Sequence, residues 1–129
     1  MISLIKRGRR DPNTKRYVYY PRWTSMGKIT KTELAKIMRG GSTFSVGEVE
    51  GIMTDFSQYI CDQLLDGKTV EIQGLGTFTL NVNGPSHEQA NRVTTEGLKV
   101  SMLFKPDKEL QRRLDTESEF QFVTRQKRR

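Results

Sequence analysis

One long amphipathic segment, residues 45–67, sets the strongest limit on how this chain can fold. Apolar residues recur in it every three or four positions over about five turns, which predicts a helix. These residues are Val49, Ile52, Met53, Phe56, Ile60, Leu64 and Leu65. Ser45-Val46-Gly47-Glu48 has the form of a capping box, and Asp66-Gly67 ends the pattern. The apolar residues surround more of this helix than one small sheet could cover, so we expect a dimer.

A shorter helix precedes this segment. Thr30-Lys31-Thr32-Glu33 is a second capping box, and Gly40-Gly41 supplies a stop. Leu34, Ile37 and Met38 mark one face of the predicted helix.

After residue 67 the apolar period changes from helical spacing to two, which predicts strands. The alternating residues are Val70, Ile72, Leu75, Phe78, Leu80 and Val82, with a bend or bulge expected at Gly74 and Gly76. Asn83-Gly84-Pro85 ends this run, residues 84–97 are polar, and residues 98–104 alternate again as a returning strand. Pro106 suits the first turn of a third helix, with Arg112 and Arg113 near its end, and residues 120–123 suggest a last strand.

The first 28 residues predict β-structure. Residues 2–6 form a short apolar stretch, residues 8–14 carry turn chemistry, and residues 16–20 are rich in strand formers that Pro21 ends. We therefore expect a hairpin with a long basic loop.

Charge is concentrated at the two ends of the chain. Residues 1–28 hold eight Lys and Arg against one acid, and residues 105–129 hold eight against five. Residues 29–104 hold six against nine, so a mildly acidic body has basic ends. Such ends predict a polyanionic partner, with solvated tails as the alternative.

The inventory of reactive side chains argues against an enzyme, a metal site or a cofactor. Cys61 and His87 are the single cysteine and histidine, whereas a structural zinc site needs four ligands. Cys61 lies in the apolar helical pattern and is expected to be a buried, inert thiol, and His87 to be an exposed loop residue. Gly74-Leu75-Gly76 is followed by a strand and not by a helix, so it is not a phosphate loop. The cysteine usage and the lack of a long apolar run predict a cytoplasmic protein without a membrane partner. Without an enzyme site, no small-molecule substrate is expected.

The order of these elements resembles the HU and integration-host-factor family of bacterial histone-like DNA-binding proteins. Residues 29–34 resemble the opening of that family's first helix, and residues 67–72 followed by Gly74-Leu75-Gly76-Thr77-Phe78 resemble its most characteristic stretch. The resemblance implies an α+β fold with two N-terminal helices, a β-hairpin sheet and a short C-terminal helix, in an intertwined dimer of the bacterial nucleoid. It also implies two β-arms that bind the DNA minor groove and bend the duplex. Some larger members from gut bacteria carry an N-terminal β segment ending in a Tyr-Tyr-Pro like Tyr19-Tyr20-Pro21.

We therefore expect three regions: a basic N-terminal β extension (1–28), an HU-like domain (29–115), and a C-terminal strand with a basic tail (116–129). The family's arm is basic, but residues 83–98 carry Arg92 against Glu88 and Glu96. This difference moves the expected phosphate contacts to the ends of the chain. The predicted DNA-binding residues are Lys6, Arg7, Arg9, Arg10, Lys15, Arg16, Arg92, Arg125, Lys127, Arg128 and Arg129.

The predicted dimer core consists of Ile52, Phe56, Ile60, Phe78 and Phe104. Tyr17, Tyr19 and Trp23 could stack or contact sugars, but packing is the commoner role of strand aromatics. The leading hypothesis is a non-enzymatic, weakly sequence-specific protein that binds double-stranded DNA as a homodimer. A histone-like scaffold for protein interaction is the alternative, and RNA binding is a third interpretation.

Overall fold

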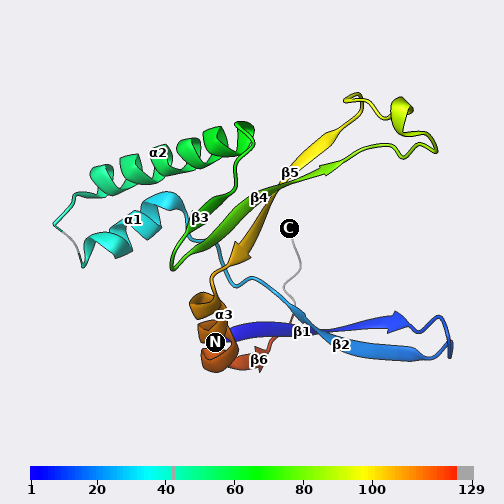
Figure 1. Ribbon diagram of the computed structural model, residues 1–129. Helices are drawn as coiled ribbons and strands as arrows, with labels where there is room; N and C mark the ends of the chain where they lie inside the picture. Colours follow the sequence, from blue (N-terminus) through cyan, green and yellow to red (C-terminus); the bar gives the residue numbers. More distant parts are fainter. Residues whose placement is uncertain (42, 125–129) are drawn as a thin grey trace. The chain divides into compact units, whose positions relative to one another are not determined.

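The computed structural model describes residues 1–41 and 43–124, and these form a mixed α+β structure, as the sequence predicts. The described residues contain three α-helices, one 3₁₀ turn and two three-stranded sheets (Figure 1). The chain divides into two compact units. Of the described residues, one unit takes the continuous stretch 31–112, and the other combines residues 1–30 with residues 113–124. The N-terminal and C-terminal segments thus cluster in one unit.

The two predicted N-terminal helices form in the continuous unit. α1 spans Lys31–Arg39 and α2 spans Val46–Leu65. The hydroxyl of Ser45 accepts a hydrogen bond from the backbone N–H of Glu48 at 3.1 Å, so the predicted cap of α2 is confirmed. The two helices are joined where Lys31 Nζ donates to Thr54 Oγ1 at 2.8 Å.

The sheet of this unit has the order β3-β4-β5, with both neighbouring pairs antiparallel. β3 is Val70–Ile72, β4 is Gly76–Asn83 and β5 is Lys99–Pro106. The expected bend lies between β3 and β4, where Gly74 has φ +87° and the N–H of Leu75 donates to the carbonyl of Ile72. At Gly76 the chains approach so closely that a Cβ would lie 2.3 Å from the carbonyl oxygen of Lys105. Gly74 therefore permits the left-handed turn, and Gly76 permits the close approach of β4 and β5.

Pro106 belongs to β5 and not to the third helix, which corrects the prediction for this residue. α3 spans Lys108–Glu117. Asp107 precedes it, accepts a hydrogen bond from the N–H of Glu109 at 3.3 Å, and donates its own N–H to the carbonyl of Leu75 at 3.0 Å. Because Asp107 anchors the chain to the β3–β4 turn, Pro106 stays in the ladder opposite Gly76.

The second sheet has the order β2-β1-β6. β1 is Ile2–Arg10, β2 is Tyr17–Trp23 and β6 is Phe120–Phe122. β1 pairs with β2 antiparallel and with β6 parallel, which brings residues 118 positions apart into register, as in Ile2 opposite Phe120. Two strand ends differ from the prediction. β1 continues through residues 8–10, which were expected to form a turn. β2 continues through Pro21, because β2 is an edge strand whose outer N–H positions need no ladder partner.

The buried apolar core of the described residues is small. It consists of Ile5, Ala35, Val49, Ile60 and Leu64. Cys61 is exposed, so the prediction of a buried thiol is wrong for this chain; α1, β3 and β4 contact α2 and leave the remainder of its surface open. Leu34, Ile37 and Met38 of α1 are exposed as well.

Candidate nucleic-acid interface

The predicted cations of the N-terminal segment lie on a β-hairpin and divide between its two faces. Residues directly opposite in an antiparallel pair share a face. Lys6 lies opposite Pro21 and Arg10 opposite Tyr17, whereas Arg7 lies opposite Tyr20. Lys6 and Arg10 therefore share one face, and Arg7 and Arg9 the other, so the expected set does not form one line of charge.

The hairpin is closed by a tight loop of residues 11–16 that presents two further cations. Asp11 exchanges backbone hydrogen bonds with Lys15 and Arg16, each at 2.8 Å, and its carboxylate accepts the N–H of Asn13 at 2.9 Å. Lys15 has φ +58°, a left-handed conformation that non-glycine residues seldom adopt. Lys15 and Arg16 are both exposed at the end of the hairpin.

Arg7 differs from the other hairpin cations because it is half-buried. Its Nε atom is buried and has no hydrogen-bond partner among the described residues. Its side chain lines a hollow of about 540 Å³ together with Ile5, Lys6, Phe122, Val123 and Thr124. The exposed cations of the hairpin are therefore Lys6, Arg9, Arg10, Lys15, Arg16 and Arg22, and the last of these was missed by the sequence analysis.

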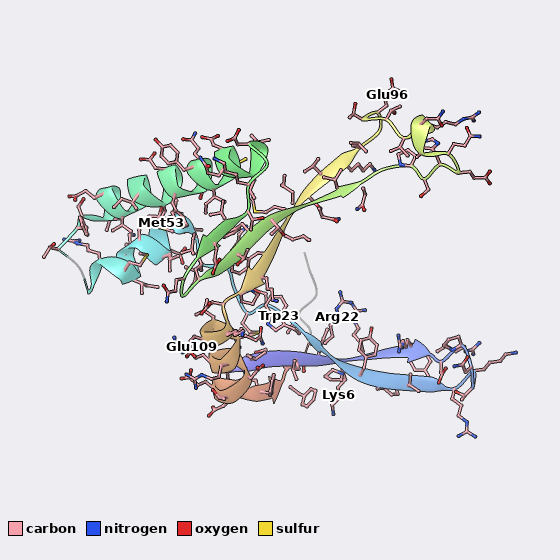
Figure 2. All side chains as sticks on the ribbon, viewed as in Figure 1. Lys6, Arg22, Trp23, Met53, Glu96 and Glu109 are labelled. Atoms are coloured by element: carbon pink, nitrogen blue, oxygen red, sulfur yellow. The ribbon has the colours of Figure 1, made fainter. Side chains whose placement is uncertain are left out.

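Aromatic side chains accompany these cations. The rings of Tyr17 and Tyr19 meet edge to face, with centroids 5.5 Å apart, and the guanidinium of Arg9 lies 5.5 Å from the centre of the Tyr20 ring. Tyr17, Tyr19 and Trp23 were expected to pack, yet they are 61%, 72% and 65% exposed. Figure 2 shows Lys6, Arg22 and Trp23 on this hairpin.

The remaining predicted DNA contacts lie elsewhere. Arg92 ends the 3₁₀ turn η1 (Ala90–Arg92), inside the loop of residues 84–98 that joins β4 to β5. Glu96 lies in the same loop (Figure 2). Arg125, Lys127, Arg128 and Arg129 lie outside the described residues.

The predicted dimer core contains four side chains that the chain leaves at least partly open. Ile52, Phe56 and Phe104 are exposed, and Phe78 is half-buried with its ring centre 4.8 Å from that of Phe104. Ile60 differs, because it is buried within the chain itself. The register extends the Phe78–Phe104 pair into an apolar sheet face whose further members are Leu80, Val82, Val100 and Met102.

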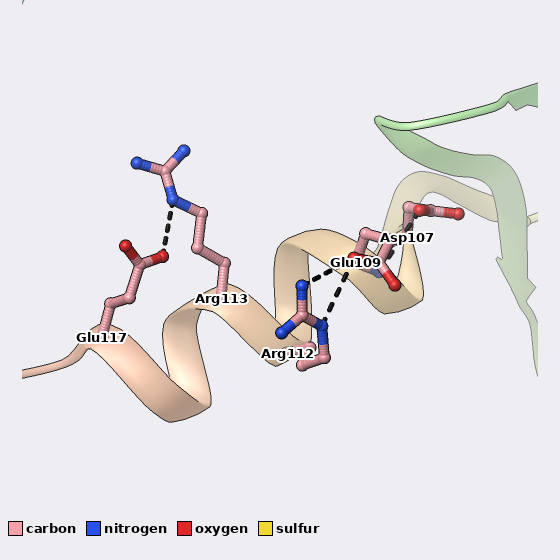
Figure 3. Close-up of polar contacts among 5 residues, drawn as sticks. All are labelled: Asp107, Glu109, Arg112, Arg113 and Glu117. Carbon is pink, nitrogen blue, oxygen red and sulfur yellow. Dashed lines mark hydrogen bonds and ion pairs between the residues drawn. The ribbon is translucent and has the colours of Figure 1, made fainter.

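Two other features bear on the site. In α3, Arg112 pairs with Glu109 at 2.9 Å and Arg113 with Glu117 at 2.7 Å, so both arginines have acidic partners (Figure 3). Within the described ranges there is no cluster of side chains that could hold a metal ion, and no helix is long and apolar enough to cross a membrane.

Comparison with known proteins gives a consistent set of relatives. Residues 3–121 match a family model described as an HU domain fused to a winged helix-turn-helix, Ig or glycine-rich motif. Integration host factor subunit beta from Shewanella sp. (strain ANA-3) and from Shewanella baltica (strain OS155) are each 35% identical over 92 residues, which cover 67% of this chain and 96% of the relative.

Solved structures show the same fold. Anabaena HU in a cocrystal with DNA has a TM-score of 0.55 at 14% identity, covering 67% of this chain and 98% of that one. A candidate bacterial DNA-binding protein from Bacteroides vulgatus ATCC 8482 has a TM-score of 0.67 at 9% identity and covers 95% of this chain. The chain spans about half the length of that protein, 47%.

Proposed function

The chain belongs to the HU and integration-host-factor family, and from this premise we propose that it is a non-enzymatic, architectural DNA-binding protein of the bacterial nucleoid. It binds double-stranded DNA as a homodimer and with weak sequence specificity. The observation that carries the proposal is the N-terminal hairpin, where residues 2–23 hold seven cationic residues against one acid.

The hairpin is suited to phosphate contacts. Its exposed cations lie on both faces and in the loop, so each face and the loop offer cations to a duplex. Asp11 is the one acid of this segment, and its carboxylate already accepts a hydrogen bond from the loop. Phosphate contacts carry no base information, which accounts for weak specificity.

The homodimer is supported by the apolar surface that the single chain leaves open. Five buried apolar side chains are a small core for the described part of a 129-residue chain. Ile52 and Phe56 on α2 are exposed. On the β4–β5 face, Leu80 and Val82 are exposed and Phe78 is half-buried. Burying the open part of each such side chain contributes about 1 kcal/mol. A second copy would supply that cover.

The loop between β4 and β5 favours a second candidate function. Residues 84–98 contain Arg92 against Glu88 and Glu96, so they offer little attraction to phosphates. A dimer with such loops could serve as a scaffold for protein interaction. The two functions differ in one measurement, because the scaffold binds duplex DNA weakly or not at all near physiological salt.

The salt dependence of duplex binding tests the proposal. Each phosphate contact contributes about 0.9 to the slope of log affinity against log salt. Arg9→Gln with Arg10→Gln should flatten this slope by about one to two units and affect random and natural duplexes alike. The matched control is Lys36→Gln with Arg39→Gln, which removes the same charge from exposed positions on α1.

We expect the control to keep the wild-type slope. An unchanged slope in the Arg9 and Arg10 variant would move the binding surface away from the hairpin strands. Wild-type protein that binds no duplex near 0.15 M salt would favour the scaffold.

A further inference from the structure

The solvent-facing side of the β2-β1-β6 sheet is unlike the rest of the surface, and we call it the aromatic face. Register places its eleven residues on one side of the sheet. They are Ile2, Leu4, Lys6, Gly8, Arg10, Tyr17, Tyr19, Trp23, Phe120 and Phe122, with Pro21 between Tyr19 and Trp23.

The other side of the same sheet holds the core of this unit. Ser3 and Ile5 are buried there, and the side-chain amide of Gln121 donates to Ser3 Oγ at 3.1 Å. Alternation along β1 therefore turns Leu4, Lys6 and Gly8 away from the core. The aromatic face is the open side of a sheet whose opposite side is already packed.

Its chemistry combines flat rings with positive charge. Tyr19 and Trp23 are 72% and 65% exposed, and Phe120 and Phe122 are also exposed. Lys6 and Arg10 lie among the rings, with Lys6 Nζ 5.0 Å from the centre of the Phe122 ring. No residue of the face is acidic. A ligand that fits offers stacking surfaces and negative charge together.

We propose that the aromatic face binds single-stranded DNA, with Tyr17, Tyr19 and Trp23 stacking on unpaired bases and with Lys6 and Arg10 contacting phosphates. This inference deepens the proposed function and rests on it, because it assigns a second form of DNA to one face of the same hairpin, where Lys6 and Arg10 would serve both forms. Aromatic side chains beside a basic groove or strip are the usual means of holding single strands without sequence preference.

Spacing favours a single strand over a duplex. The ring centres of Tyr17 and Tyr19 are 5.5 Å apart, whereas stacked bases in a duplex repeat at about 3.4 Å per strand. A stretched single strand can present successive bases to successive rings. In a duplex the bases are paired and stacked on one another, so their flat surfaces are not available.

Charge disfavours a second copy of the chain as the occupant. Two aromatic faces packed against each other would bury Lys6 and Arg10 of both copies, with no acid on either face to pair them. A polyanion removes this difficulty, since it neutralises both cations.

Trp23 offers a direct readout, because it is the single tryptophan of the chain. Full-length protein is titrated with an oligothymidine of about 15 nucleotides and with an abasic strand of the same length. The two strands carry the same phosphates, but only the first has bases. We expect the oligothymidine to quench Trp23 fluorescence and to bind at least tenfold more tightly than the abasic strand.

Substitutions then locate the contact. Tyr19→Leu keeps an apolar residue in the strand and should weaken oligothymidine binding about fivefold or more. The double variant Tyr19→Leu with Trp23→Leu should lose more than about tenfold in affinity, measured by fluorescence anisotropy of a labelled strand. The matched control is Tyr20→Leu, on the same strand but on the opposite face, which should stay within twofold of wild type. Unchanged circular dichroism shows that each variant is folded.

Several outcomes would overturn the assignment. Equal binding of abasic and base-containing strands would show that charge alone, without base stacking, accounts for binding at this face. Tighter binding of oligouridine than of oligothymidine would assign it to RNA. A change in oligomer mass of the Tyr19 and Trp23 variant, at unchanged single-strand affinity, would assign it to a contact between copies. Duplex binding measured in parallel separates the two proposals: wild-type protein that binds duplex DNA but does not prefer oligothymidine to the abasic strand refutes this inference alone.

Discussion

Gly8 and Tyr17 are interlocked across the β1–β2 ladder: a Cβ atom on Gly8 would lie 2.2 Å from Cε1 of the Tyr17 ring. The same atom would lie 3.0 Å from Cε1 of Tyr19. The two rings, which meet edge to face, thus lie over the one position of β1 that has no side chain. A glycine inside a strand normally weakens it, and here the aromatic cover compensates.

Gly8→Ala should therefore disrupt the hairpin. The new methyl group must displace the Tyr17 ring, and overpacking of this kind costs about 1–3 kcal/mol. Hydrogen exchange of the β1 and β2 amides should accelerate accordingly, while the amides of α2 keep their rates. Gly47→Ala, where nothing lies within 4 Å of the added Cβ, is the control and should not accelerate exchange. Equal exchange in both variants would contradict the interlocked arrangement.

Gly76→Ala should be more damaging, because the added Cβ would meet backbone. It would lie 2.3 Å from the carbonyl oxygen of Lys105 and 2.7 Å from the Phe104 ring, in the ladder that joins β4 to β5. We expect the free energy of unfolding, measured in urea, to fall by about 3 kcal/mol or more. Gly41→Ala has open space around it and should change this value by less than about 1 kcal/mol. A stable Gly76 variant would show that β5 can move away from β4.

Dimerisation can be tested by mass and by one core substitution. Light scattering on a size-exclusion column should give about twice the 14.9 kDa of the chain at micromolar concentration. Phe56→Asp places a charge on the open side of α2 and should abolish cooperative unfolding, because dimer and core would form one structure. Glu50→Asp, on the same helix, changes no charge and serves as the control. A folded monomer, in wild type or variant, would refute the obligate dimer.

Shortening the loop of residues 84–97 to a tight turn should leave duplex affinity within a few-fold of wild type. The segment has one basic and two acidic residues, so it releases few counterions. Gel-shift titration at two salt concentrations checks the prediction. A hundredfold loss would mean that the loop contacts DNA despite its charge.

Sequence patterns predicted the elements whose signals are local. The Ser45 capping box, the stop at Gly67 and the change of apolar period all correspond to observed features, because each depends on neighbours within a few residues. The length of β1 and the passage of β2 through Pro21 depend instead on partners across the sheet: the rings over Gly8, and the edge position of β2. Cys61 was placed in a core because of its apolar neighbours, but burial requires a covering surface that this chain does not provide on that side.

In the candidate site, too, some features follow from local sequence and others from tertiary structure. Composition located the cations, but the strand register was needed to show that Lys6 and Arg10 share a face with Tyr19 and Trp23. The half-burial of Arg7 on the other face likewise depends on the folded structure. The exposure of the aromatic residues follows from where the sheet is covered, which is a tertiary property.

The parallel pairing of β6 with β1 also has a consequence for the order of folding. Residues 31–112 form one continuous unit, whereas the β2-β1-β6 sheet needs Leu4 to meet Phe122. Closing so large a loop costs more entropy than any local hairpin, and it requires the last strand to have left the ribosome. The β1–β2 hairpin must therefore remain a two-stranded ribbon until β6 arrives to complete the sheet.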